Sequence, residues 1–132
     1  MTVLLRTIDQ VPGASTVEGP ELSFLVGQVT AREIIRARVT AEVERHNSER
    51  EPHAFVGLVQ PLPVEQQLNP ARPERPRALN AQRQIEVALE AVRKGRVIIL
   101  FNGEQVTDID APLVVTPVSE ARFLKLVPLV GG

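Results

Sequence analysis

The residues of this chain best placed for chemistry are the two glycines at its end. Residues 123–132 read FLKLVPLVGG, in which an apolar, strand-like run leads to Pro128, Leu129 and Val130 and then to Gly131 and Gly132. Proline stops strand pairing and holds a chain extended, and glycine adopts backbone angles that other residues cannot. We therefore expect residues 128–132 to be a flexible tail that ends in a carboxylate with no side chain around it.

Other groups that could carry chemistry are better explained by structural roles. His46 and His53 have no third ligand at metal spacing, so we interpret them as a helix-end and a loop histidine. Asp108 and Asp110 follow a predicted hairpin and precede Ala-Pro, which favours a solvated turn over a metal site. The sequence has no Ser-His-Asp set, phosphate-binding loop or zinc spacing. We expect no enzyme active site, metal or cofactor in this chain.

Composition excludes several further classes of function. The length of 132 residues and the apolar fraction of 43% are typical of one globular domain, which we assign to residues 1–132. A net charge of -1 gives no attraction to nucleic acid or to an anionic membrane, and the absence of cysteine excludes disulfides and thiolate chemistry. No apolar stretch approaches about 18 residues, and the N-terminal sequence lacks a signal-peptide layout. We expect a cytoplasmic protein with no nucleic-acid or membrane partner.

Two strands and a helix are predicted before residue 48. Residues 2–9 and 21–29 are typical of strands, and the polar stretch between them predicts a loop of an antiparallel hairpin. Thr30 and Glu33 form a capping box at the start of a helix over residues 30–46. The helix is expected to bury Ile35, Val39 and Val43 and to expose the i,i+4 pair Arg38 and Glu42 on its opposite face.

The second half begins with an insertion at residues 48–95. Its first part is proline-rich, with Pro70, Pro73 and Pro76 at every third position, and its second part predicts a helix between an Asn80 cap and Gly95. That helix is expected to bury one face formed by Ala81, Ile85, Ala88, Leu89 and Val92. Beyond it, a central strand over 96–101, an Asn102-Gly103 hairpin turn, a short strand over 112–115 and a last strand over 121–127 are predicted.

The order of these elements and the chain end resemble the ubiquitin-like β-grasp family. Residues 97–113, VIILFNGEQVTDIDAPL, are similar to the family's strand-turn-strand segment, and residues 121–132, ARFLKLVPLVGG, are similar to its final strand and diglycine tail. The resemblance covers residues 2–47 and 96–132. It implies an α+β fold with a mixed sheet crossed by a helix, to which the Pro-rich segment and the second helix are an addition. In this sheet we expect the first strand and the last to be adjacent and parallel.

The resemblance also implies what the tail does. A ThiF-type adenylating enzyme would join the Gly132 carboxylate to AMP, and a thiol would then attack the acyl adenylate. The tail would thread a narrow channel, where Gly131 and Gly132 fit because they have no side chains. By the same resemblance, Leu126, Pro128, Leu129 and Val130 are the residues by which the tail would be recognised.

The resemblance implies three functions, which stay open at this point. A protein modifier would pass, with a conjugating enzyme, from a thioester to an amine on target proteins, as bacterial members encoded with their own enzymes do. A sulfur carrier would form a C-terminal thiocarboxylate, as VPLVGG suggests by its similarity to such tails. A non-covalent interaction module would not use the carboxylate. The size and the insertion favour the modifier.

Lysines and prolines suggest further contacts. Lys94 and Lys125 are the only lysines. We expect Lys94, near a helix end, to be the accessible acceptor if the protein is attached to itself, and Lys125, within a strand, to be restricted. The proline triplet, with Arg72, Arg75 and Arg77, could dock on an aromatic groove, but a plain surface insertion is favoured.

Overall fold

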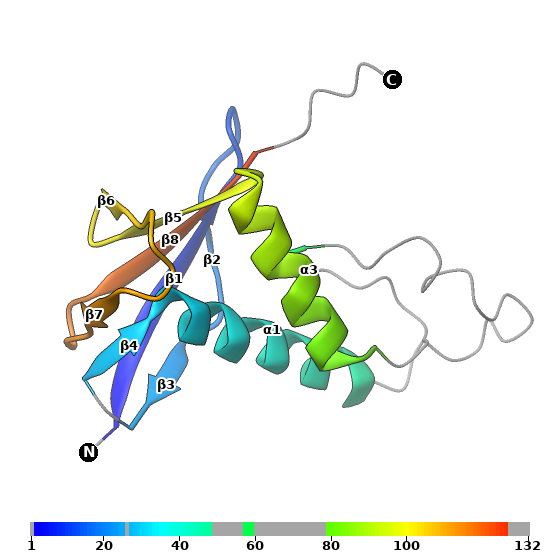
Figure 1. Ribbon diagram of the computed structural model, residues 1–132, viewed down its shortest axis with the longest axis horizontal. Coiled ribbons are helices and arrows are strands. Elements are labelled where there is room, and N and C mark those ends of the chain that lie inside the picture. The colour runs from blue at the N-terminus through cyan, green and yellow to red at the C-terminus, as the bar shows by residue number, and fades with distance from the viewer. Residues whose placement is uncertain (1, 26, 49–56, 60–78, 127–132) are drawn as a thin grey trace, which may run out of the picture.

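The structure, a computed structural model, describes residues 2–25, 27–48, 57–59 and 79–126 (Figure 1). Its elements are β1 (Val3–Gln10), β2 (Val17–Glu18), β3 (Leu22–Phe24), β4 (Gln28–Thr30), α1 (Ala31–Ser48), α3 (Ala81–Arg93), β5 (Val97–Phe101), β6 (Glu104–Gln105), β7 (Pro112–Val114) and β8 (Glu120–Lys125). Six strands form a mixed sheet in the order β2-β1-β8-β5-β6, with β3 also pairing with β1, and β4 and β7 form a separate pair. The fold is mixed α+β.

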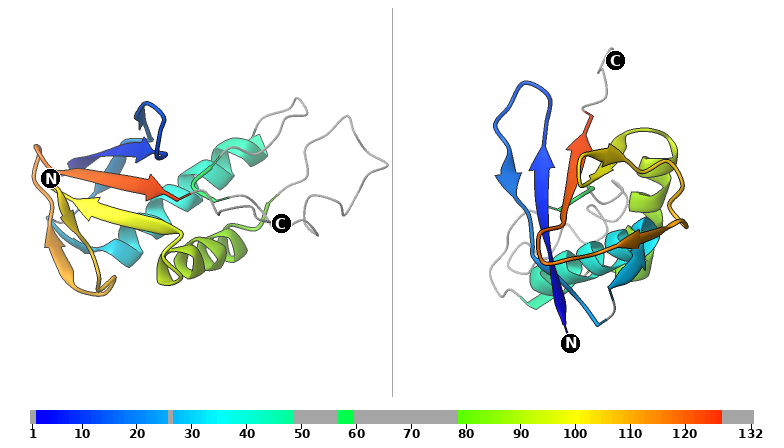
Figure 2. Two further views of the ribbon diagram at one scale, coloured as in Figure 1. Left: turned by 90° about the horizontal axis from the view of Figure 1, so that it is seen from above. Right: turned by 90° about the vertical axis from the view of Figure 1, so that its left-hand side faces the viewer.

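The last strand of this sheet, β8, lies at its centre. It pairs in parallel with β1, where Thr7 is opposite Ala121, and antiparallel with β5, where Ile99 is opposite Phe123. The expectation that the first and last strands are adjacent and parallel is therefore confirmed. Alternate side chains of these strands are buried on one face, and α1 lies across that face (Figure 2).

The predicted strand over residues 21–29 is wrong as one continuous element. The structure divides it into β3, which pairs with β1, and β4, which pairs with β7 in the smaller sheet. Phe24 is opposite Val3, the first residue of β1, so the chain beyond Phe24 has no further partner on that strand. It bonds instead to the segment after β7, where the N–H of Val115 donates to the carbonyl of Gly27 at 2.6 Å. Val26 lies outside the described residues.

The stretch predicted as a loop between the first two strands also contains a short strand. β2 pairs antiparallel with β1, with Ile8 opposite Glu18, and the N–H of Gly19 then donates to the carbonyl of Thr7 at 3.0 Å. A Cβ at position 19 would lie 2.6 Å from the Thr7 hydroxyl oxygen, so this close approach needs glycine. The antiparallel hairpin itself is confirmed, although its returning strand is interrupted.

The capping signals of α1 behave as predicted. The Thr30 N–H donates to Glu33 Oε1, and the Glu33 N–H donates to Thr30 Oγ1, both at 3.2 Å, which is a reciprocal capping box. Ile35, Val39 and Val43 are buried in the core. The core also takes a residue of the insertion, since Leu58 is 4% exposed and packs among these residues.

Both ends of α3 match their sequence signals. The Asn80 side chain accepts from the Arg83 N–H at 2.9 Å. At the other end, Gly95 has φ +75°, its N–H donates to the carbonyl of Val92, and the Arg96 N–H donates to that of Ala91. This is a Schellman motif, which stops the helix after Arg93. The predicted two-residue turn is present too, since Asn102 and Gly103 both have positive φ between β5 and β6.

The buried face of α3 differs from the predicted one. Ile85 and Ala88 are buried as expected, but they are joined by Ala91 and by Gln84, whereas Ala81, Leu89 and Val92 are only partly buried. The difference arises because α3 packs against α1 as well as near β5, which shifts its contact surface by one residue. Gln84 is 0% exposed, and neither atom of its amide has a hydrogen-bond partner in the described part of the chain.

We expect Gln84→Leu to stabilise the protein. A buried amide that is not hydrogen-bonded costs about 1–3 kcal/mol, and leucine has nearly the same volume without that penalty. Urea unfolding should therefore show a free energy of unfolding higher by roughly 1 kcal/mol or more. Gln82→Leu, at an exposed position of the same helix, is the control and should change it by less than about 0.5 kcal/mol. Destabilisation by Gln84→Leu would show that the amide has a partner in the folded protein.

Candidate functional site: the root of the C-terminal tail

The structure describes the point at which the predicted tail leaves the sheet. Lys125 is opposite Val97 in the β5–β8 ladder, and the Leu126 N–H donates to the carbonyl of Arg96 at 2.9 Å. We call Lys125 and Leu126 the tail root. Of the predicted tail residues, Leu126 is thus held at the end of the ladder. Pro128, Leu129, Val130, Gly131 and Gly132 lie outside the described residues.

The predicted acceptor Lys94 is close in the chain to the tail root's partner. Lys94 is the C-cap of α3, and Arg96, two residues later, is the residue that binds Leu126. In Figure 1 the C-terminal end of α3 lies beside the end of β8. The Lys94 side chain is 49% exposed and its Nζ lies 3.5 Å from Glu90 Oε1. Its ammonium group is accordingly accessible.

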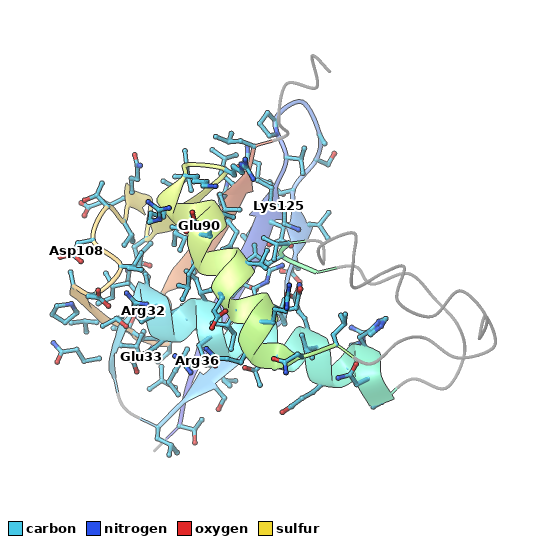
Figure 3. The ribbon with its side chains drawn as sticks, turned by 45° about the vertical axis from the view of Figure 1, so that its right-hand side comes forward. Arg32, Glu33, Arg36, Glu90, Asp108 and Lys125 are labelled. Atoms are coloured by element: carbon cyan, nitrogen blue, oxygen red, sulfur yellow. The ribbon has the colours of Figure 1, made fainter. Side chains whose placement is uncertain are left out.

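Lys125 is held more firmly than Lys94. Its Nζ lies 3.4 Å from Asp9 Oδ2 and donates to the carbonyl of Gly57 at 3.3 Å, and 26% of its side chain is exposed. Figure 3 shows Lys125 at the C-terminal end of β8. An amine that binds a carboxylate and a carbonyl is less available for attack on an acyl group than a solvated one.

A cluster of charged side chains lies beneath the tail root. Its central residue is Arg38, for which the predicted exposed position is wrong. The sequence predicts Arg38 on the exposed face of α1, but only 2% of its side chain is accessible. Its guanidinium binds both carboxylate oxygens of Asp9, with 2.6 Å between Nη2 and Oδ2, and lies 3.3 Å from Glu42 Oε2. Its Cζ is 4.7 Å from the centroid of the Phe123 ring, a cation–π arrangement. We call Asp9, Arg38, Glu42 and Lys125 the Arg38 cluster.

The cluster is buried because α1 is covered on more than one side. The row of residues at positions 34, 38, 42 and 46 lies next to the predicted stripe, and Ile34 and His46 in that row are buried as well. Since α1 contacts both the sheet and α3, its buried surface is wider than a single row at four-residue spacing. The predicted Arg38–Glu42 pair is present, but it lies inside the protein.

Burial and ion pairing shift the pKa values of Asp9 and Arg38 in opposite directions. Burial by itself would raise the pKa of Asp9, but the hydrogen bond and charge of Arg38, with Lys125, outweigh it and hold that pKa below its usual value of 3.8. Burial would likewise lower the pKa of Arg38, whereas the hydrogen bond to Asp9 and the charge of Glu42 raise it. Asp9 and Arg38 are therefore ionised at neutral pH.

We expect this cluster to make the protein sensitive to acid. Because the pKa of Asp9 is lower in the folded than in the unfolded protein, its stabilising contribution is complete above 3.8 and is lost as pH falls through the folded-state value. The free energy of unfolding, from urea titrations between about pH 6 and pH 2.5, should decline less steeply in Asp9→Asn than in the wild type. The difference should persist in about 1 M salt, which screens exposed pairs. Equal slopes for the two proteins would contradict the pairing of Asp9.

An exposed ion pair joins the start of α1 to the segment before β7. The Arg32 guanidinium donates to Asp110 at 2.7 Å, and this hydrogen bond lowers the pKa of Asp110. The Arg32 N–H also donates to the carbonyl of Ile109, and Asp108 Oδ1 accepts from the Asp110 N–H. The predicted turn is thus present, and Figure 3 shows Asp108 and Arg32 at this end of the molecule.

The structure describes one of the remaining candidates. His46 is a buried residue of α1, and His53 and the proline triplet lie outside the described residues. Within the described ranges, no group of three or more His, Cys, Asp or Glu side chains is arranged to hold a metal ion. The same ranges contain no helix with both the length and the apolar character needed to cross a bilayer.

Sequence signals for the Arg38 cluster existed but were incomplete. Leu5, Thr7 and Asp9 alternate along β1, and period two places Asp9 on the face of the buried Leu5. Position 38 is four residues from Ile34 and three from Ile35. What the sequence could not supply was the pairing itself, because Asp9 and Arg38 are 29 residues apart.

Searches against models of protein families, against curated proteins and against solved structures found no match to this chain.

Proposed function

We propose that this chain is a ubiquitin-like protein of the β-grasp type, whose Gly132 carboxylate is activated by an adenylating enzyme and transferred through a thioester to an amine on target proteins. The observation that carries the proposal is the position of β8. The strand that leads to the diglycine is central in the sheet, parallel to β1 and antiparallel to β5. A hairpin, a crossing helix and a last strand adjacent and parallel to the first are the arrangement expected from the β-grasp resemblance.

The central position of β8 suits a tail that must be handed to an enzyme. A strand paired on both sides cannot shift without breaking two ladders, so Lys125 and Leu126 fix the point from which the tail starts. The residues beyond this point alone then have to adapt to the enzyme's channel. Gly131 and Gly132 suit a narrow channel because they have no side chains to exclude.

The proposed reaction has three steps. A Gly132 carboxylate oxygen attacks the α-phosphorus of ATP, pyrophosphate leaves, and an acyl adenylate forms. A thiolate of the activating or conjugating enzyme then attacks the acyl carbon and displaces AMP, and the resulting thioester is attacked by a lysine amine, which releases the thiolate and loses a proton. This chain contributes the carboxylate and its placement, and the enzymes contribute the reactive side chains.

A sulfur-carrier function is the second candidate, supported by the apolar, proline-containing VPLVGG. Activation would be the same, but a sulfur donor would replace AMP and leave a thiocarboxylate at Gly132. The two functions therefore share the adenylation step and differ in the group that then attacks the acyl adenylate.

Mass spectrometry of the protein from its native host tests both functions. It first establishes whether the mature chain ends at Gly132. A modifier predicts peptides in which Gly132 is joined to a lysine amine of another protein, and a sulfur carrier predicts a fraction heavier by the difference between sulfur and oxygen. Where the protein is attached to itself, we expect Lys94 rather than Lys125, because Lys125 binds Asp9 and Gly57. A mature chain that ends elsewhere, or that carries neither product, would refute activation at Gly132.

A further inference from the structure

The insertion contacts the Arg38 cluster at two neighbouring residues. Lys125 Nζ donates to the carbonyl of Gly57 at 3.3 Å, and the N–H of Leu58 donates to Glu42 Oε1 at 3.0 Å. Gly57 and Leu58 are both buried. In the left view of Figure 2, the short green segment of residues 57–59 lies beside the tip of β8.

Glu42 joins the insertion to the interior of the protein because it uses both of its oxygens. Oε1 accepts from Leu58, while Oε2 lies 3.3 Å from Arg38 Nη2. Lys125 acts in the same way from the other side, since it binds Gly57 and lies 3.4 Å from Asp9 Oδ2.

Each contact to the insertion thus depends on the same central pair. The cluster contains two cations and two anions, and Asp9 and Arg38 bind each other between Lys125 and Glu42. Loss of one outer charge leaves the cluster unbalanced in a site with little water, where the remaining groups must move or take up water. Loss of the Glu42 charge is therefore expected to alter the contacts of Lys125, and loss of the Lys125 charge is expected to alter those of Glu42.

We propose that Glu42 and Lys125 are positioning residues that couple residues 57–58 of the insertion to the tail root. Gly57 and Leu58 are buried and do not meet the enzyme themselves; they act through Lys125, which holds the tail root in the position that an adenylating enzyme enclosing the tail as far as Leu126 would contact. The enzyme-binding part rests on the proposed function, whereas the coupling within the protein does not.

Hydrogen exchange of the full chain tests the coupling. Glu42→Ala removes the acceptor of the Leu58 N–H but no group that touches Leu126. We expect it to speed exchange about tenfold or more at Leu58 and also measurably, by roughly threefold, at Leu126. Lys125→Met should speed exchange at Leu58, although Lys125 binds Gly57 and not that amide.

Matched controls separate coupling from general loosening. Glu44→Ala and Arg36→Met change exposed residues of the same helix and should leave both amides as in the wild type. Amides at the centre of the sheet, such as that of Phe123, should be unaffected by Lys125→Met, which shows that the protein stays folded. The coupling would be overturned if Glu42→Ala speeds hydrogen exchange at Leu58 but not at Leu126, and Lys125→Met leaves exchange at Leu58 unchanged.

Activation kinetics test whether the enzyme depends on this coupling. With the adenylating enzyme, Lys125→Met should raise the KM for this protein by about tenfold and leave kcat within about twofold, because the Gly132 carboxylate itself is unchanged. Arg36→Met should leave both constants unchanged. Unaltered KM together with altered exchange would refute the role of the coupling in activation but keep the proposed function. The absence of any adenylation of the wild type would refute the proposed function and leave the exchange result standing.

Discussion

Removal of Gly131 and Gly132 is expected to abolish adenylation and every covalent product at the chain end, while the melting temperature stays within about 1–2 °C of the wild type. The reaction needs the Gly132 carboxylate in the enzyme's channel, and a chain that ends at Val130 places a branched side chain and a carboxylate two residues short of it. The stability of the fold should not change when the two glycines are removed, because its described hydrogen bonds and core end at Leu126. Adenylate formation and pyrophosphate release measure the loss of activation, and thermal unfolding measures the melting temperature.

A variant of unchanged length makes this result specific. Gly131→Val combined with Gly132→Val keeps the carboxylate at its distance from the tail root but adds side chains, and it should also lose most of its activation. If the protein is instead a non-covalent module, both variants will keep their partner affinities and their cellular effect. Full function in the truncated protein would end the proposal that the carboxylate is the reactive group.

Arg38→Leu is expected to destabilise the protein by about 3–5 kcal/mol, close to the whole stability of a marginal domain. Asp9 and Glu42 would be left in a buried site without the guanidinium that binds them both. Arg38→Lys should recover only part of this loss, since an ammonium group lacks the planar fork that binds two carboxylates at once. Urea unfolding followed by circular dichroism measures the change, and the insertion amide of Leu58 should lose its protection in parallel.

The control for this prediction is another arginine of the same helix. Arg36 is exposed and is labelled in Figure 3, and Arg36→Leu should change the free energy of unfolding by less than about 0.5 kcal/mol. Neutralising the carboxylates together with the cation, in Asp9→Asn, Glu42→Gln and Arg38→Leu, should restore stability relative to Arg38→Leu alone, because neither carboxylate is then left without the guanidinium. Lys125 loses Asp9 in this variant but is partly exposed and keeps the carbonyl of Gly57. Similar losses for the Arg36 and Arg38 variants would show that the cluster does not form.

Local features of the chain were predictable because each depends on a few neighbouring residues. The capping box of Thr30 and Glu33, the cap at Asn80, the helix end at Gly95 and the turn at Asn102-Gly103 all occur as expected. Each is determined by backbone angles and hydrogen bonds within three to five residues, and the residue types at those positions indicate them. The adjacency of the first and last strands was predicted in a different way, from the resemblance of the element order to a known fold.

The interruption after Phe24 could not be predicted from residues 21–29, whose pattern is that of one strand. Where a strand stops depends on where its partner stops, and β1 begins only at Val3. The face of α3 differs for a related reason, because α1 as well as the sheet decides which of its side chains are covered, and this brings Gln84 inside.

By itself, then, the sequence determined the mixed α+β class, the ends of the helices, the hairpin turn and the diglycine that suggests the chemistry. Only the tertiary structure decided that Arg38 is buried, that Asp9 binds it, and that Lys125 joins the tail root to Gly57. These contacts link positions 29 and 68 residues apart. Periodicity shows which side of an element is apolar, but whether a charge on the edge of that side is exposed or paired depends on what the rest of the chain places against it.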